Sequence, residues 1–217
     1  MECRMFRNNP VLKKTVTVML IAAIAVSAVM TVISVLNKPQ AEIDMETVVF
    51  VQKQPDAANA ETAVIETSCG TIKAVLYPEY APKVTENFKS LANSGYYDGT
   101  YVYEIDRGHW FSAGTPNENG DLNPDFDKKN ESVKATAHQN LWPFKGALCA
   151  VPTSEDKSKA GSRFMFLNTT DFDAQTKEEM LKVPGGEKLA ETFFELGGIP
   201  NLSQQICVFG QVFEGMD

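Results

Sequence analysis

The stretch from Gly95 to Pro116 limits the possible fold of this chain more than any other. Near its start lies Asp98-Gly99, a pair that favours a tight turn. The β-forming residues from Tyr101 to Ile105 then predict a strand, which Gly108 interrupts. A bulky cluster, His109-Trp110-Phe111, follows directly. This order of turn, aromatic strand and break predicts part of a domain that is mainly β.

The residues before this stretch predict two strands and a helix. Ala63–Thr67 and Thr71–Leu76 have strand-like composition and are separated by a turn, Ser68-Cys69-Gly70. Pro82 suits the first turn of a helix, and Asn93-Ser94-Gly95 ends it. The apolar positions of that helix fall on one face, at helical spacing: Val84, Phe88 and Leu91.

The residues after the stretch are less regular. Residues 117–145 predict a loop, and Gly146–Pro152 predicts another strand. Lys177–Lys182 and Glu187–Leu196 predict two short helices within a long connection. We therefore expect one domain of mainly β structure with several helices over residues 61–217.

An uncharged and almost wholly apolar segment, Thr15–Leu36, precedes this domain. As a helix at about 1.5 Å per residue it would reach about 33 Å, enough to cross the hydrocarbon core of a bilayer. A buried core helix and a cleaved signal peptide are the alternatives, although the apolar region of a signal peptide is usually about 7–15 residues long. Because basic residues precede the segment, we expect a single-pass anchor in the cell membrane, with the N-terminus in the cytoplasm and the domain outside. Cleavage would instead release a secreted domain.

These features divide the chain into four parts. Residues 1–14 form a basic cytoplasmic segment, residues 15–36 a transmembrane helix, residues 37–60 a linker and residues 61–217 the folded domain. Within the linker, Thr47–Val51 could form a short strand.

Charge and cysteine spacing argue against several classes of function. The formal net charge is -8, and no basic stripe follows the N-terminal segment, so nucleic acid is not expected as a partner. No Cys-x-x-Cys pair is present, which excludes zinc ribbons and thioredoxin-like sites. His109 and His138 lie far apart in sequence, and we expect no metal site. Cys149 and Cys207 could form a disulfide if their strands are neighbours, or could be two small buried thiols.

Together these segments resemble the cyclophilins, the barrel-shaped peptidyl-prolyl cis-trans isomerases, over Ala63–Asp217. Residues 95–116 resemble the family motif G-x-Y-D-G-T-x-F-H-R-x-x-x-x-F-M-x-Q-G-G-D-P, and the helix before them resembles L-Y-P-E-x-A-P-K-x-x-E-N-F-x-x-L. Residues 161–166 resemble G-S-Q-F-F-I, and residues 208–217 resemble V-F-G-x-V-x-E-G-M-D. A helical insertion, here within residues 167–200, is familiar from bacterial relatives.

The resemblance implies a closed β-barrel with a few helices, preceded here by the transmembrane helix. The family continues past the position of Asp217 through a short helix and a last strand that closes the barrel. We therefore expect the final barrel strand to be missing, either because the sequence is a fragment or because the barrel is open at one edge. Thr47–Val51 could fill that edge.

The resemblance also implies prolyl isomerisation, a reaction that needs no cofactor. The double-bond character of the amide sets a barrier of about 18–20 kcal/mol, and the family's arginine lowers it by donating hydrogen bonds near the proline nitrogen. Here the arginine's position holds Glu104, and an ionised glutamate only accepts hydrogen bonds. Arg163 replaces a neighbouring glutamine, so it either forms an ion pair with Glu104 or supplies the missing donor.

The family's substrate-binding positions are altered too. Trp110 replaces a methionine and Ser112 a glutamine, while Leu202 is retained. The positions that the resemblance assigns to substrate binding are His109, Trp110, Ser112, Val151, Pro152, Met165 and Leu202. Their apolar members are expected to line a slot for proline.

These features predict an isomerase-like protein that binds proline-containing segments of exported proteins at the membrane surface and helps them to fold. A catalytically silent module that holds such segments is the alternative from a different class. A third possibility is a structural domain whose pocket is filled by His109 and Trp110.

Overall fold

The computed structural model describes residues 43–121, 132–154, 156–170 and 172–216. The contacts divide the chain after Ile43, and the helices and strands below all belong to the second unit, Asp44–Asp217. The predicted cytoplasmic segment and transmembrane helix, residues 1–36, lie outside the described residues. Among the residues that are described, no helix is long and apolar enough to span a membrane.

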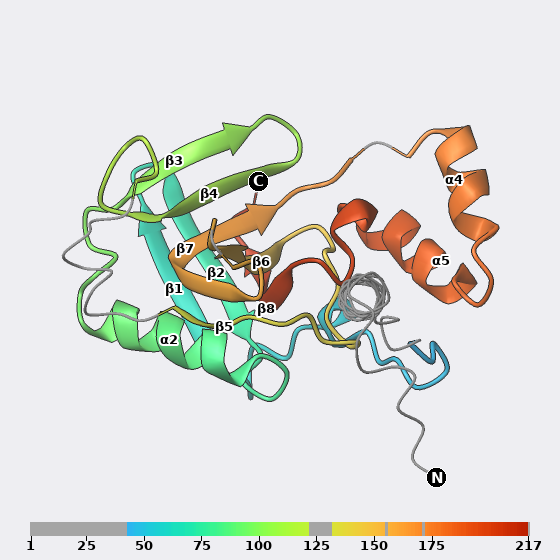
Figure 1. The fold of residues 1–217 in the computed structure, drawn as a ribbon, viewed down its shortest axis with the longest axis horizontal. Coiled ribbons are helices and arrows are strands. Elements are labelled where there is room, and N and C mark those ends of the chain that lie inside the picture. Colours follow the sequence, from blue (N-terminus) through green and yellow to red (C-terminus); the bar gives the residue numbers. More distant parts are fainter. Residues whose placement is uncertain (1–42, 122–131, 155, 171, 217) are drawn as a thin grey trace, which may run out of the picture. The chain divides into compact units, whose positions relative to one another are not determined.

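Antiparallel strands form the main body of this unit (Figure 1). They make an eight-stranded sheet in the order β1-β2-β8-β6-β7-β4-β3, with β5 paired to β7. The strands are β1 (Thr62–Thr67), β2 (Gly70–Leu76), β3 (Tyr101–Asp106), β4 (Trp110–Thr115), β5 (Val133–Lys134), β6 (Ala147–Pro152), β7 (Lys159–Leu167) and β8 (Cys207–Glu214). The helices are α2 (Pro82–Asn93), α4 (Ala174–Leu181) and α5 (Glu187–Leu196), with short 3-10 helices η2 (Val51–Lys53) and η3 (Pro200–Leu202).

Most of the predicted elements are confirmed. The helix α2 begins at Pro82, and α5 has the predicted bounds. The helix α4 starts earlier than predicted because Asp173 caps it: its carboxylate accepts a hydrogen bond from the Thr176 backbone N–H at 2.7 Å.

The sheet is a half-barrel: the closed barrel that the resemblance implied is not observed, whereas the open edge that we considered, because the final strand was expected to be missing, is. Strands β1 and β3 are its edges, and within the described part of the chain neither pairs with a further strand. On β3, Val102 and Ile105 pair with Ala113 and Phe111, which pack in or against the core, so all four share one face. No element within the described residues covers this edge, and Val102 is 45% exposed and Ile105 69% exposed.

Two hydrophobic clusters lie on the opposite faces of the sheet. Side chains alternate along β2, so Ala74 and Leu76 enter one cluster while Val75 and Tyr77 enter the other. The inner core, which contains Ala74, is covered by α2, whose Phe88 contacts the rings of both β7 and β8. The outer core, which contains Val75, extends over β6 and β8 to η3.

The segment that we interpreted as a linker is packed against the domain from Asp44 onward. We call residues 44–60 the strap. Val48 is 2% exposed, and the Phe50 ring meets the Phe144 ring edge-on with centroids 5.8 Å apart. The suggestion that Thr47–Val51 fills a sheet edge is wrong, because this stretch pairs with no strand and Val51 opens the 3-10 helix η2.

Gln52 is the polar centre of the strap and is buried. Its amide nitrogen donates to the Trp142 carbonyl at 2.9 Å and to the Gln211 side-chain oxygen at 2.8 Å. Its amide oxygen accepts from the Trp142 backbone N–H at 2.6 Å. The strap also reaches α5, where the Lys188 ammonium donates to the Val48 carbonyl at 3.0 Å. It therefore connects the helical insertion to β8.

The buried cysteines cannot form the disulfide that we considered. Strands β6 and β8 are neighbours, but Cys149 is paired with Val208 while Cys207 is paired with Ala150. As a result Cys149 points into the outer core and Cys207 into the inner core, on opposite faces of the sheet. Both are free buried thiols, as the alternative interpretation held.

Candidate functional site

Four neighbouring strands bring several predicted site residues into one row. Glu104 on β3 pairs with Ser112 on β4, Ser112 pairs with Met165 on β7, and Met165 pairs with Cys149 on β6. Directly paired residues present their side chains on the same face of a sheet. Because Cys149 belongs to the outer core, this row marks the outer face of the half-barrel. We refer to it as the outer-face row.

A hydrogen bond fixes the relation between Glu104 and Ser112. The Ser112 hydroxyl donates to the Glu104 carboxylate at 3.1 Å, and Ser112 itself is completely buried. Glu104 is exposed, so one of its carboxylate oxygens accepts from a buried hydroxyl while the residue as a whole faces solvent. Glu104 is thus positioned as an acceptor, which is the opposite of what the family's arginine provides.

The relation of Arg163 to Glu104 differs from the ion pair that we considered. Arg163 lies two residues before Met165 on β7 and therefore on the same face. The ion pairs within the described residues do not include one between Arg163 and Glu104. The positive charge of Arg163 instead lies near Tyr103: burial raises the pKa of that phenol, and Arg163 partly opposes the rise.

Tyr103 is a member of the site that sequence reasoning missed. The register of β3 shifts between Val102 and Glu104, so Tyr103 is an extra residue opposite β4. Arg163, Ser112 and Glu104 all lie close enough to the Tyr103 phenol to affect its pKa. Burial is the largest influence and raises the pKa of Tyr103 above its ordinary value; Arg163 and Ser112 oppose this, and Glu104 adds to it. The alternating pattern of a strand carries no signal for such a bulge.

Three of the apolar residues of the predicted pocket pack against the outer core. Trp110, Met165 and Leu202 are each half-buried and each packs against the outer core. They come from β4, β7 and η3, elements that are far apart in sequence. This part of the site has the apolar character that a proline ring requires.

His109 lies in the turn just before β4, and its ring is 5.9 Å from that of Trp110, centroid to centroid. Its Nδ1 atom is 3.0 Å from the Asp106 carboxylate, and its side chain is 42% exposed. Val151 and Pro152 differ from the expectation. They stand at the end of β6, beyond a shift in register with β7, and neither belongs to the outer core.

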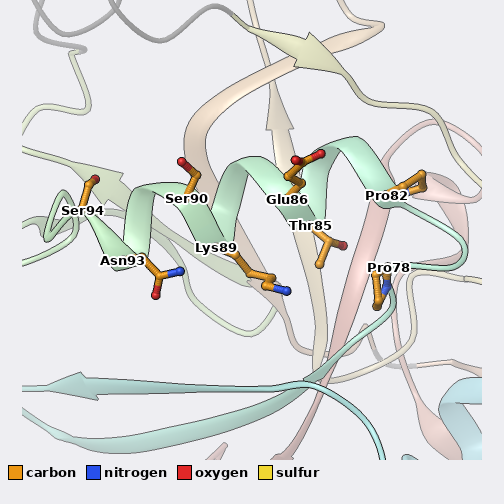
Figure 2. Close-up of a pocket in the computed structure, with 8 residues that line it drawn as sticks. All are labelled: Pro78, Pro82, Thr85, Glu86, Lys89, Ser90, Asn93 and Ser94. Carbon is orange, nitrogen blue, oxygen red and sulfur yellow. The ribbon is translucent and has the colours of Figure 1, made fainter.

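Two hollows on the described surface lie elsewhere. One, of about 770 Å³, follows α2, and Figure 2 shows Lys89, Asn93 and Thr85 on one side of that helix. The other, of about 170 Å³, lies at the start of α2 beside Lys134 and Cys207. Neither is lined by a predicted site residue. Among the described residues no cluster of three or more histidine, cysteine and acidic side chains is arranged to hold a metal ion.

A comparison with models of protein families identifies the family of this domain. The model of the family described as "Cyclophilin type peptidyl-prolyl cis-trans isomerase/CLD" matches residues 62–217. The chain belongs to the cyclophilin family. The resemblance noted from the sequence motifs is thereby confirmed.

Individual relatives agree with this assignment. A Streptococcus pyogenes protein described as "Putative bifunctional phosphatase/peptidyl-prolyl cis-trans isomerase" is 28% identical over 165 residues, which are 76% of this chain and 34% of that protein. A Staphylococcus epidermidis protein described as "Putative peptidyl-prolyl cis-trans isomerase" is 26% identical over 72% of this chain and 78% of its own length. This cyclophilin chain thus spans about a third of the streptococcal relative.

A solved structure agrees in fold. The crystal structure of a Cryptosporidium parvum cyclophilin-type isomerase, determined in the presence of the dipeptide Ala-Pro, superimposes with a TM-score of 0.52 at 20% identity. The match covers 72% of this chain and 80% of that one. At this identity the likeness concerns the fold of the cyclophilin domain.

Proposed function

We propose that this cyclophilin domain binds proline-containing polypeptide segments on its outer face and isomerises their X-Pro bonds. The observation that carries the proposal is the outer-face row, in which Glu104, Ser112 and Met165 lie side by side on paired strands. Trp110 and Leu202 add apolar surface on the same core. The structure determined with Ala-Pro, although of a distant relative, supports a proline-containing ligand.

The chemistry requires two contributions from such a face. Apolar side chains must hold the proline ring, and a donor must stabilise the twisted amide near its nitrogen, where conjugation is lost. Trp110, Met165 and Leu202 provide the first. Loss of one transition-state donor costs about 10²–10³-fold in rate, so the replacement of arginine by Glu104 lowers turnover unless another group donates.

We further propose that the domain acts at the membrane surface on exported proteins. The support is the apolar segment Thr15–Leu36 with basic residues before it. Fractionation of cells that express the full chain, followed by protease treatment of intact cells, tests this. The expected result is a membrane-bound protein whose domain is degraded from outside. Recovery of the full-length chain in the soluble fraction would refute it.

The test of activity is turnover of a short X-Pro peptide by the full chain in detergent, with Glu104→Arg assayed beside it. The expected result is measurable turnover by the parent protein and a higher rate in the variant, since an arginine restores a donor at that position. Circular dichroism shows that both proteins are folded. Absence of turnover in both folded proteins would overturn the isomerase proposal.

The silent binding module is the second candidate, and one observation favours it. Glu104 is held as an acceptor by Ser112 and is not paired with Arg163 among the described contacts. This function predicts no turnover by the parent protein, binding of the proline peptide in calorimetry, and a gain of turnover in Glu104→Arg. Loss of both binding and turnover would instead indicate the purely structural domain.

A further inference from the structure

A tight turn begins at Leu202, one of the apolar residues of the predicted pocket. The Gln205 backbone N–H donates to the Leu202 carbonyl at 3.0 Å, which closes a β-turn. Of its two central residues, Ser203 has a φ of −55° and a ψ of 127°, and Gln204 has a φ of +59°. These angles are those of a type II turn, whose third position favours glycine or asparagine. We refer to residues 202–205 as the pocket turn.

Glutamine is an unusual residue for this position. Among the residues that the structure describes, Gln204 is the one residue other than glycine with a positive φ. In this conformation the Cβ atom crowds a backbone oxygen, which costs free energy that glycine avoids. Backbone strain of this kind is concentrated at functional sites, where a particular side chain is needed. The side chain of Gln204 is therefore a candidate for a role in binding.

The two central side chains of the pocket turn also have unpaired polar atoms. Within the described part of the chain, the buried side-chain polar atoms without a hydrogen-bond partner are Tyr77 Oη, Thr85 Oγ1, Ser203 Oγ and Gln204 Nε2. Native proteins contain few such groups, because an unpaired buried donor is costly. Ser203 and Gln204 are each half-buried as whole residues, so both side chains reach the surface although these atoms are shielded from solvent. The rotatable bonds of glutamine allow its amide to turn outward.

The place of the pocket turn indicates what such a donor would meet. Leu202 packs against the outer core, as do Trp110 and Met165, and Ile206, just after the turn, is buried in that core. The turn thus lies at the edge of the surface that we propose for the proline ring. Every residue of a bound segment has a carbonyl that accepts hydrogen bonds, whereas proline has no N–H to donate. A donor from the protein therefore suits a proline-containing segment.

We propose that the side-chain amide of Gln204 donates a hydrogen bond to a backbone carbonyl of the bound segment, beside the proline ring. In the free protein this donor is unpaired and the backbone at Gln204 is strained; the segment supplies the acceptor that the chain itself lacks there. The inference rests on the proposed binding of proline-containing segments and identifies a binding residue for it. It holds for the isomerase and for the silent binding module alike.

The experiment measures binding of a short X-Pro peptide to the full chain in detergent by calorimetry. Gln204→Gly removes both the amide and the strain, whereas Gln204→Met removes the amide and keeps the length of the side chain. Gln205→Met is the matched control, because Gln205 is exposed and its amide already donates to the Asn201 carbonyl at 2.7 Å. Thermal unfolding shows that each variant is folded.

We expect the Kd of the peptide to rise about 5–10-fold in both Gln204 variants, as for the loss of one hydrogen bond. Gln205→Met should stay within about twofold of the parent protein. The Tm of Gln204→Gly should be no lower than that of the parent, because relief of the strain offsets the freedom that glycine adds to the unfolded chain.

Two outcomes separate this inference from the function on which it rests. Binding by the parent with an unchanged Kd in Gln204→Gly or in Gln204→Met would overturn the role of the Gln204 amide and leave the proposed function standing. A folded parent that does not bind the peptide would refute the proposed function, and this inference with it.

Discussion

Replacement of Gln52 by alanine is the sharpest test of the strap. Three hydrogen bonds of 2.6–2.9 Å join the Gln52 amide to the Trp142 backbone and the Gln211 side chain. All three residues are buried, with exposed fractions of 3% for Gln52 and Trp142 and 6% for Gln211. Alanine would leave the Trp142 N–H, the Trp142 carbonyl and the Gln211 oxygen without these partners.

The cost follows from these orphaned groups. A buried donor or acceptor that loses its partner costs about 1–3 kcal/mol, and water that enters the space vacated by the side chain recovers part of it. We therefore expect Gln52→Ala to lower the free energy of unfolding by about 3 kcal/mol. In a domain of this size that corresponds to a fall in Tm of about 6–12 °C.

The measurement is urea unfolding of the full chain followed by circular dichroism, with Gln54→Ala as the control. Gln54 is exposed and lies just after the same 3-10 helix, so its replacement should change the free energy of unfolding by less than about 0.5 kcal/mol. If Gln52→Ala cost less than about 1 kcal/mol, as little as an ordinary exposed hydrogen bond, the strap would not be bound in solution as described here.

Three further outcomes are expected. In the native protein a thiol reagent should modify Cys69, which is exposed, but modify Cys149 and Cys207 only after denaturation; a Cys149–Cys207 disulfide found by mass spectrometry would contradict their placement on opposite faces. Burial raises the pKa of Cys207 to about 11, so the folded state holds its proton longer than the unfolded state, and the free energy of unfolding should fall as the pH rises from about 9 to about 11; the same decline in Cys207→Ala would assign it to other groups. Phe88→Ala should lower the free energy of unfolding by about 3–5 kcal/mol in urea titrations, because its ring packs between those of Phe164 and Phe209 in the inner core; a loss below about 1 kcal/mol would mean that α2 does not cover that core as described.

Local signals are the reason why most of the fold could be predicted. The helix α5 was predicted at its observed bounds, and α2 begins at Pro82 where the first-turn proline indicated. The strap could not be predicted in this way. Its key residue, Gln52, is polar and bonds Trp142, which is 90 residues away, so neither composition nor periodicity marks it as buried.

In the candidate site, too, some residues could be predicted from the sequence and others could not. Glu104, Ser112 and Met165 were found because motif positions fixed their places on paired strands, and the structure brings them together. Tyr103 was missed because the bulge breaks the alternation that assigns side chains to faces. His109 lies beside Trp110, as the motif indicated, but its contact with Asp106, three residues away, could not be predicted from the motif.

The strap also determines where this domain begins as a unit that can be produced and studied alone. The family model starts at residue 62, which would be the natural place to begin a shortened protein. Such a protein would lack Val48 and Gln52, and it would expose the surface around Trp142 and Gln211 that they cover. An autonomous version should therefore start no later than Asp44, where the compact unit begins. Activity or stability measured on a shorter version would describe a domain that lacks part of its packed structure.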